Sequence, residues 1–232
     1  MQRYETIRAE DPQTIQQGIE FASKIGYQGL IIRTPPGTDI HREDFAEISE
    51  DFNLVHAIEL RPESKEQASG LIGQYRSECD LLVLRGASSP LNRFAVEHEL
   101  IDVLSEPMIH GGDFNHVYAH AANENNVCIE FGLRPVLQTA GGSRVRHIQN
   151  LQKLYELVQD ADAPYVVSGR ASSPFELRGW RELNALCEHL FEDSGFFETG
   201  IKQWKKRADR NSVRHDDDFI EPGVRKEYRS DE

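Results

Sequence analysis

The sequence has few cysteines, few lysines and no long apolar segment. Its three cysteines (Cys79, Cys128 and Cys187) are odd in number and lie 49 and 59 residues apart. This spacing excludes a disulfide scaffold and a compact cysteine-based zinc site, and it fits a reducing cytoplasm. No apolar run approaches the roughly 18 residues of a membrane span. The first residues also lack the apolar stretch of a secretory signal, so we expect a cytoplasmic protein that does not enter a membrane.

Lysine supplies only 7 of the 26 basic residues, whereas aspartate and glutamate number 39, which gives a net charge of −13. Such a charge argues against a simple nucleic-acid binder on composition alone. Scarce lysine with an excess of acid is typical of proteins from salt-loaded cytosols, where the Debye length falls to about 3 Å at 1 M salt. An ordinary acidic cytosolic protein is the alternative interpretation. The charge is distributed unevenly. Residues 1–199 carry 17 basic and 31 acidic side chains, whereas residues 200–232 carry 9 basic and 8 acidic ones.

Short apolar runs alternate along the chain with longer segments that have helical spacing. These runs are rich in leucine and β-branched residues, as expected of strands that are buried on both faces. They occupy residues 29–33, 55–60, 80–85, 102–104, 126–131 and 164–168, and an earlier strand is expected at 4–8. Seven strand–helix alternations predict parallel strands with right-handed crossovers. The expected fold is α/β, a TIM-barrel-like (β/α) barrel, with a doubly wound open sheet as the alternative.

Helix start signals precede several of the intervening segments. Asp11-Pro12, Ser89-Pro90 and Ser173-Pro174 each place an N-cap residue before a proline suited to the first helical turn. Apolar spacing predicts a further helix over 147–159, and a last helix from Phe196 to Arg210. We therefore expect a single (β/α) barrel domain over 1–212, followed by an extended charged C-terminal tail over 213–232.

Arginine recurs at the carboxyl ends of the predicted strands, where parallel barrels carry their functional residues. The arginines at these ends are Arg33, Arg61, Arg85, Arg134 and Arg170. A ring of guanidinium groups at one mouth would suit phosphate, through charge and paired hydrogen bonds. The alternative is that each arginine pairs with a neighbouring acid. Glu59 and Glu106 stand at the same ends and could serve acid–base chemistry, but pairing with the arginines is the favoured interpretation.

A histidine cluster is the most metal-like feature of the sequence. It comprises His110, Asp113, His116 and His120, and a helix beginning near Asn115 would place the last two histidines one turn apart. The glutamate of a metalloprotease motif is missing, and Asn115 has the character of an N-cap. A hydrolytic centre would also need histidine and aspartate at the early strand ends, where neither is found. We predict no catalytic residue and no metal-binding residue.

Two further segments combine features that suit phosphate. Gly141-Gly142 leads into Arg144 and Arg146, which could offer backbone N–H groups and cations, although turn formation also explains the glycines. Six basic residues against one acid lie within 202–214, among them Lys205 and Lys206. This basic helix could anchor a phosphate backbone, or it could be a solvated face with cations near the helix C-terminus.

Several ordered blocks give the sequence a resemblance to archaeal ribonuclease P protein component 3, the homologue of a nuclear ribonuclease P subunit in eukaryotes. The blocks cover nearly the whole chain and are QASGLIGQYR (67–76), LNRFAVEHELIDVL (91–104), GGDFNHVYAHAA (111–122), VCIEFGLRPVL (127–137), GGSRVRHIQNLQKLYELV (141–158), DAPYVVS (162–168) and FIEPGVR (219–225). The scarce lysine and the acidic composition make the chain similar to haloarchaeal members.

The resemblance implies a cytoplasmic ribonucleoprotein that removes the 5′ leader from precursor tRNA. In that family the RNA subunit performs the Mg²⁺-dependent hydrolysis, so the chain is expected to bind no cofactor. Its implied partners are ribonuclease P RNA, ribonuclease P protein component 2, other ribonuclease P proteins and precursor tRNA. The implied barrel is related to barrel metallophosphoesterases, but residues 5–8 and 168–170 stand where that superfamily has a histidine-rich signature and an Asp-x-His motif.

An accessory RNA-binding and protein-binding subunit is therefore the preferred hypothesis. For it we predict RNA contacts at Arg33, Arg85, Arg93, Arg144, Arg146, Lys205 and Lys206. The first alternative is a metal-dependent barrel phosphoesterase that uses Glu59, His110 and Asp113. The second is a small-molecule barrel enzyme whose arginines hold a phosphate. The strand ends carry cations but no cluster of histidine and aspartate, and this favours the preferred hypothesis.

Overall fold

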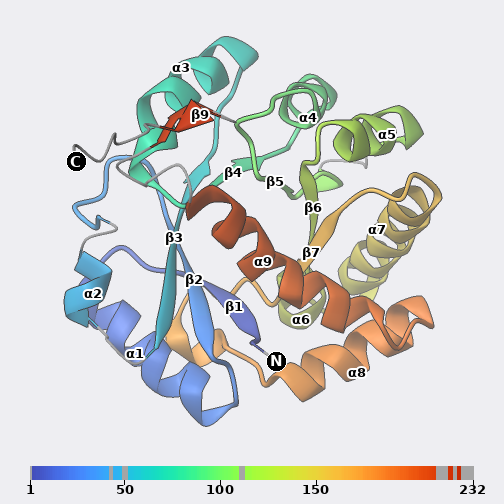
Figure 1. The fold of residues 1–232 in the computed structure, drawn as a ribbon. Coiled ribbons are helices and arrows are strands. Elements are labelled where there is room, and N and C mark those ends of the chain that lie inside the picture. Colours follow the sequence, from blue (N-terminus) through green and yellow to red (C-terminus); the bar gives the residue numbers. More distant parts are fainter. Residues whose placement is uncertain are drawn as a thin grey trace, which may run out of the picture.

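Parallel strands form the centre of the molecule (Figure 1). The computed structural model describes residues 2–41, 44–48, 52–109, 113–212, 219–221 and 224–225. One sheet of seven strands follows chain order from β1 to β7 within these residues. The strands are β1 Tyr4–Arg8, β2 Gly29–Thr34, β3 Asn53–Leu60, β4 Leu81–Arg85, β5 Val103–Ser105, β6 Cys128–Gly132 and β7 Tyr165–Ser168. The sheet curls until the Arg8 N–H donates to the carbonyl of Ala171, just beyond β7, at 2.9 Å.

This nearly closed barrel confirms the TIM-barrel-like prediction, and the open-sheet alternative is wrong. β1 has the predicted bounds, and the ends of the other six strands lie within two residues of their predicted positions. The six strands after β1 could be located from the sequence because each is a short, mainly apolar run, as expected of strands buried on both faces. Within β2, for example, every one of the six residues is buried.

Helices surround the barrel (Figure 1). Their bounds are α1 Pro12–Lys24, α2 Asp44–Ile48, α3 Lys65–Tyr75, α4 Ser89–Val96, α5 His116–Glu124, α6 Arg134–Gln138, α7 Gly141–Asp160, α8 Trp180–Phe191 and α9 Phe196–Ser212, with 3₁₀ turns η1 Arg76–Glu78 and η3 Pro174–Glu176. The predicted N-caps at Asp11 and Asn115 are confirmed. Asp11 accepts from the Thr14 N–H at 2.8 Å, and Asn115 accepts from the Val117 N–H at 3.0 Å.

Other helix boundaries differ from the predicted ones. The N-cap of α4 is Ser88 rather than Ser89, which leaves the proline within the first helical turn. The pair Ser173-Pro174 opens only the short turn η3, and α8 begins later at Trp180. Gly141 is already the first residue of α7, so this glycine pair and the arginines after it lie in the helix rather than in a loop before it.

The strands separate two groups of buried side chains. Alternate residues such as Leu30 and Ile32 face outward and pack in the larger core beneath the surrounding helices. The other residues of the amino-terminal parts of the strands point into the barrel. They form a second apolar cluster that includes Tyr4, Ile31 and Leu81, and the buried Arg207 donates to Cys128 Sγ of this cluster at 3.0 Å. The period-two alternation of a strand thus builds both cores from the same runs of sequence.

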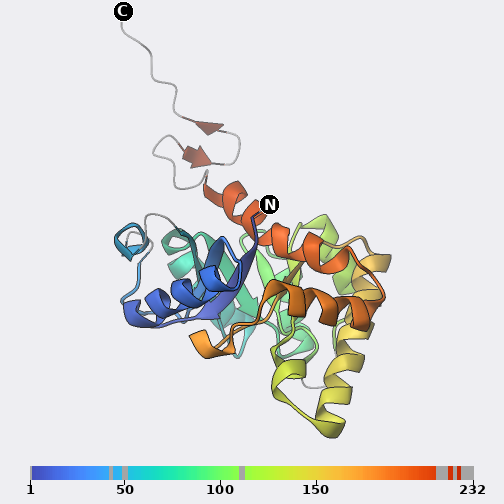
Figure 2. The ribbon, with the colours of Figure 1, turned by 90° about the horizontal axis from the view of Figure 1, so that it is seen from below.

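Helix α9 closes the amino-terminal end of the barrel, as Figure 2 shows beside the N-terminus. Trp204 is fully buried in the inner cluster, and its Nε1–H donates to the Val167 carbonyl at 2.9 Å. Two turns further on, Asn211 donates from Nδ2 to Asp102 Oδ1 at 2.7 Å and to the Asp80 carbonyl at 2.9 Å. Both aspartates precede strands, so the carboxyl ends of the strands form the opposite mouth.

The predicted tail lies largely outside the described residues. β8 (Phe219–Glu221) pairs antiparallel with β9 (Val224–Arg225), while 213–218, 222–223 and 226–232 are not described. The division of the chain at residue 212 therefore stays a prediction. No helix among the described residues is long and apolar enough to cross a membrane.

Candidate nucleic-acid interface at the barrel mouth

The carboxyl ends of the strands surround a polar hollow of about 330 Å³, which we call the mouth. Six arginines and two glutamates line it together with four other residues; these eight charged residues are Arg8, Arg33, Arg61, Arg85, Arg134, Arg170, Glu59 and Glu106. Strand alternation accounts for this set, because Arg33, Glu59 and Arg85 continue the inward-facing positions of β2, β3 and β4 beyond the apolar cluster. The lining of the mouth thus holds six guanidinium groups against two carboxylates.

Arg33 lies at the base of the mouth, buried between two carboxylates. Its side chain is 4% exposed, with Nη1 at 2.5 Å from Glu130 Oε1 and Nη2 at 2.6 Å from Glu59 Oε2. Burial by itself raises the pKa of the Glu59 carboxyl, but the charges of Arg33, Arg170 and Arg61 outweigh burial and hold that pKa at about 2. Glu59 is therefore a fixed anion whose oxygens are directed at guanidinium groups.

Arg170 crosses the mouth and joins the same network. It pairs with Glu106, and its Nη2 and Nε lie 3.9 Å from Glu59 Oε1 and 3.7 Å from Glu130 Oε2. Glycine is required beside it, because a Cβ atom at Gly132 would lie 2.4 Å from Arg170 Cδ. Arg170 and Glu106 have φ angles of 51° and 52°, in the left-handed region that side chains avoid. Such residues cost about 1–3 kcal/mol each and persist where the surrounding contacts fix them.

The outer arginines of the mouth remain open to solvent. Arg8, Arg61 and Arg134 keep 43%, 45% and 41% of their side chains exposed, although they pair with Glu10, Glu59 and Glu176 in turn. We call these three residues the rim. The Arg8–Glu10 and Arg134–Glu176 pairs are exposed enough to contribute only about 0–1 kcal/mol, so a phosphate can replace their carboxylates at little cost, whereas Arg61 pairs with the buried Glu59. Arg8 was not identified from the sequence, although it is the last residue of β1 and the other arginines were recognised at or near strand ends.

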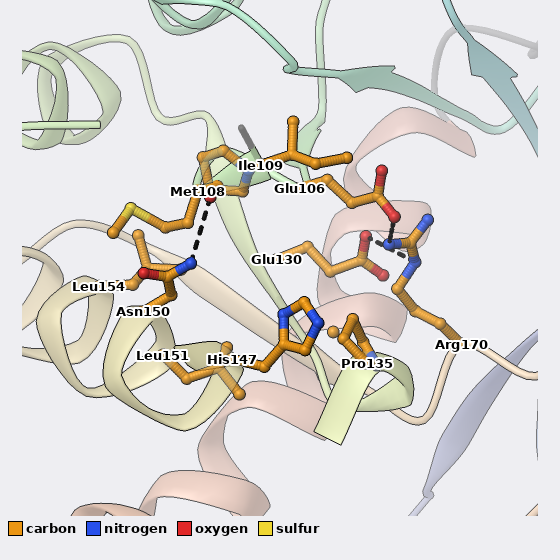
Figure 3. Close-up of a pocket in the computed structure, with 12 residues that line it drawn as sticks. Glu106, Met108, Ile109, Glu130, Pro135, His147, Asn150, Leu151, Leu154 and Arg170 are labelled. Carbon is orange, nitrogen blue, oxygen red and sulfur yellow. Dashed lines mark hydrogen bonds and ion pairs between the residues drawn. The ribbon is translucent and has the colours of Figure 1, made fainter. Parts of the chain in front are cut away.

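A second hollow of about 190 Å³ adjoins the mouth and shares Glu106, Pro135 and Arg170 with it (Figure 3). Its wall is mostly apolar, formed by side chains such as Leu151 and Leu154 from α7. The carboxylates of Glu106 and Glu130 and the guanidinium of Arg170 converge at one side, as Figure 3 shows. The charged network therefore separates a polar hollow from an apolar one.

The structure divides the seven predicted RNA contacts between different parts of the molecule. Arg33 is buried between two glutamates, so it is not presented to a ligand, and we withdraw it from the proposed contacts. Arg85 lies in the mouth with 30% of its side chain exposed, paired with Glu106. Arg93 is exposed on α4 and pairs with Glu97 one turn along the helix at 2.8 Å.

The remaining four predicted contacts lie on helices. Arg144 and Arg146 are exposed in the first turns of α7, where Arg144 Nε donates to the Thr139 carbonyl at 2.6 Å. Lys205 and Lys206 belong to α9 and so lie at the other end of the barrel, and Lys205 pairs with Asp209 at 2.6 Å. The predicted contacts thus do not form one face.

The predicted pairing of Glu59 and Glu106 with arginines is confirmed. This pairing does not suit a divalent cation, because the carboxylate oxygens already face guanidinium groups. Among the residues that the structure describes, no cluster of three or more histidine, cysteine, aspartate or glutamate side chains could hold a metal ion. His116 and His120 are exposed on α5, whereas His110 lies outside the described residues.

Fold and mouth together define a TIM-barrel-like protein with an arginine–glutamate network at the carboxyl ends of its strands. A sequence model of the family described as RNase P subunit p30 matches residues 5–195. The chain belongs to this family. It has the function of a ribonuclease P protein subunit, and the endoribonuclease activity is that of the whole complex.

Individual relatives agree with this assignment. The ribonuclease P protein component 3 of Natronomonas pharaonis is 42% identical over 213 residues, which cover 91% of this chain and 89% of the relative. That of Haloarcula marismortui is 38% identical and covers 99% of both chains. These relatives support the ribonuclease P hypothesis rather than the phosphoesterase alternative.

Solved structures show the same fold. A chain of an archaeal ribonuclease P determined with mature tRNA superposes with a TM-score of 0.83 at 20% identity, over 99% of this chain and 100% of its own length. A prolidase complexed with N-methylphosphonate-L-proline superposes with a TM-score of 0.50 at 7% identity, over 82% of this chain and 69% of its own. At such identities the likeness is one of fold.

Proposed function

We propose that this chain is an accessory subunit that binds RNA and protein within a cytoplasmic ribonuclease P. Its partners are ribonuclease P RNA, precursor tRNA, ribonuclease P protein component 2 and other ribonuclease P proteins. The RNA, with Mg²⁺, carries out the removal of the 5′ leader, and this chain binds no cofactor and performs no hydrolysis by itself. Family membership over residues 5–195 supports the proposal.

The observation that carries the RNA-binding part is the cationic mouth of a chain with a net charge of −13. A molecule of this charge repels RNA as a whole, so binding depends on local clusters of cations. Arginine suits such clusters because its planar fork donates paired hydrogen bonds to phosphate and keeps its charge. The rim arginines and Arg85 are the accessible cations of the mouth. Arg93, Arg144, Arg146, Lys205 and Lys206 stay in the proposal as further contacts outside it.

Reconstitution tests the proposal. Ribonuclease P RNA and the other protein subunits are assembled with and without this chain, and precursor-tRNA cleavage is measured at limiting Mg²⁺. We expect the chain to raise cleavage, and the double variant R61Q/R134Q to lose part of that gain. Lys153, an exposed lysine on α7, provides the matched control K153Q, which should behave as wild type.

Two outcomes would contradict the proposal. Equal cleavage with and without the chain would show that it is not an accessory subunit. Hydrolysis of precursor tRNA by the isolated chain with Mg²⁺ or Mn²⁺, abolished in the variant E59Q, would revive the phosphoesterase alternative.

A further inference from the structure

One phenylalanine stands almost fully in water beside the mouth. Phe175, in the turn η3, is 73% exposed, the largest exposure of any large apolar side chain among the described residues. Its neighbour Phe21 on α1 is 38% exposed, and the two ring centroids lie 5.6 Å apart in an edge-to-face arrangement. An exposed aromatic pair is unfavourable in water, so it is a candidate contact surface.

The turn that carries Phe175 is held in place on both sides of the ring. Arg178 Nη1 donates to the carbonyl of Phe175 at 3.2 Å, and the hydroxyl of Tyr27 donates to the Arg178 carbonyl at 3.1 Å. Pro174, the first residue of the turn, and Leu177, which follows it, are buried. The phenyl ring is therefore presented from a fixed backbone, which reduces the entropy lost when a planar group stacks on it.

Cations surround these rings. Arg178 and Arg181 are exposed, and neither pairs with a carboxylate within the described part of the chain. The guanidinium carbons of Arg181 and Arg3 lie 4.6 and 3.8 Å from the centroid of Trp180.

Trp180 and the phenyl rings both lie beside α1. α1 connects them, because Phe21 lies on this helix and a Cβ atom at Gly26, just beyond its end, would lie 3.3 Å from Trp180 Nε1. Segment 170–181 holds three arginines and one glutamate, in contrast to the acidic chain as a whole. Aromatic and basic side chains are thus interleaved across α1, η3 and the start of α8.

We propose that these side chains bind an unpaired stretch of RNA, and we call them the aromatic surface: Phe21, Phe175, Arg178, Trp180 and Arg181. A base stacks on the free face of Phe175, and the arginines contact the adjoining phosphates. The inference rests on the proposed function, since it assumes that the chain works bound to RNA. Stacking platforms flanked by cations are the usual means of holding single strands without reading their sequence.

Two features favour RNA over a protein partner. The exposed apolar area comprises only the two rings of Phe21 and Phe175, and it adjoins Arg178, whose guanidinium has no carboxylate partner among the described residues. The surface is also continuous with the mouth, because Arg134 of the rim binds Glu176 of the same turn, with Nη2 to Oε1 at 3.0 Å. An RNA strand whose phosphates lie on the rim can therefore continue onto Phe175.

Binding of an eight-nucleotide single-stranded oligoadenylate to the full chain provides the direct test. We expect F175A to weaken binding by a factor of about 5 to 150, the range for loss of one base–aromatic stack. F175L should weaken oligoadenylate binding similarly, whereas F175W should bind as wild type does. R178Q should lower the slope of log affinity against log salt by about 0.7, as for one single-strand phosphate contact. V117A, which alters another exposed apolar side chain on α5, is the matched control.

An RNA duplex of eight base pairs should not distinguish F175A from wild type, because its bases are not free to stack on the ring. Full oligoadenylate affinity in F175A or F175L would overturn the inference. Unchanged RNA binding together with loss of a ribonuclease P protein from the assembled complex in F175A would show a protein contact instead, and would also overturn it.

The reconstituted holoenzyme separates this inference from the proposed function. If the wild-type chain stimulates cleavage and F175A does so equally, with the same RNA footprint over unpaired nucleotides, the aromatic surface is not an RNA contact while the proposed function stands. If the wild-type chain itself does not stimulate cleavage, the proposed function fails. The unfolding temperatures of the variants should match that of wild type, because Phe175 is exposed.

Discussion

The two halves of the barrel interior are built from the same strands but from opposite chemistry. At the amino end, Tyr4, Ile31 and Leu81 pack with Trp204 of α9 into an apolar cluster that meets a single buried cation among the described residues, Arg207 of the same helix. At the carboxyl end, the next inward positions hold Arg33 and Glu59, together with other arginines and glutamates. The amino half is closed by a helix, whereas the carboxyl half opens to solvent at the rim.

This difference separates stability from recognition. Apolar burial stabilises by roughly 25 cal/mol for each Å² removed from water, and α9 keeps water from that half. Buried ion pairs add little net stability, because the cost of desolvation offsets their attraction, but an unpaired buried charge is strongly destabilising. The carboxyl half thus holds its charges in position for a ligand without being the main source of folding energy.

Truncation of Trp204 should give the largest loss of stability. W204A removes a fully buried indole and leaves the Val167 carbonyl without its donor. We expect a loss of about 3–5 kcal/mol from the side chain and about 1 kcal/mol more from the carbonyl. Urea unfolding measures it, with W180A as the control because Trp180 is only partly buried. Equal losses in the two variants would show that α9 does not seal the barrel.

Arg33 tests the charged half in the same way. R33A leaves Glu59 and Glu130 as buried anions, so we expect a loss of about 3–5 kcal/mol at pH 7. Because the pKa of Glu59 is lowered from 4.5 to about 2 on folding, its pairing stabilises the protein above pH 4.5 and is lost as the pH falls toward 2.

The loss in R33A should therefore shrink when unfolding is repeated at pH 3, whereas the loss in W204A should change little. The exposed helix pair of Arg93 and Glu97 provides the control R93A, with an expected loss below about 0.5 kcal/mol. A loss in R33A that is equal at pH 3 and pH 7 would contradict the electrostatic explanation.

The next largest change in stability is expected at Glu5, on the outer face of β1. Burial raises the pKa of Glu5 from 4.5 to about 7, even though the N–H groups of Thr6 and Gly169 donate to it. Folding then favours the protonated form, so this contribution to stability is complete below pH 4.5 and is lost as the pH rises to 7. E5Q, which keeps the acceptor oxygen, should gain about 3 kcal/mol relative to wild type between pH 4 and pH 8. Identical pH profiles of unfolding would contradict the shift.

Most strands could be located from the sequence because buried strands consist of nearly continuous apolar runs. The arginines at the strand ends were also recognised, since strand order alone brings such ends together. Their partners could not be assigned, because Arg33 meets Glu130 across 97 residues of chain and only the closed barrel makes them neighbours. The position of α9 was likewise missed. Its basic face is visible in the sequence, but the end of the barrel that it covers depends on where Trp204 is buried.

The rim should show the smallest effect on stability and a clear effect on RNA. Arg61 and Arg134 keep nearly half of their side chains exposed, so R61Q/R134Q should unfold within about 1 kcal/mol of wild type. If each contacts one phosphate, the slope of log affinity against log salt should fall by about 1.4 for single-stranded RNA or about 1.8 for a duplex. Titrations of ribonuclease P RNA at several salt concentrations measure the slope, with K153Q as the control. A loss of stability with an unchanged slope would mean that the rim arginines, like Arg33, only balance the charge of their glutamates. The carboxyl half would then contribute to stability and not to RNA binding.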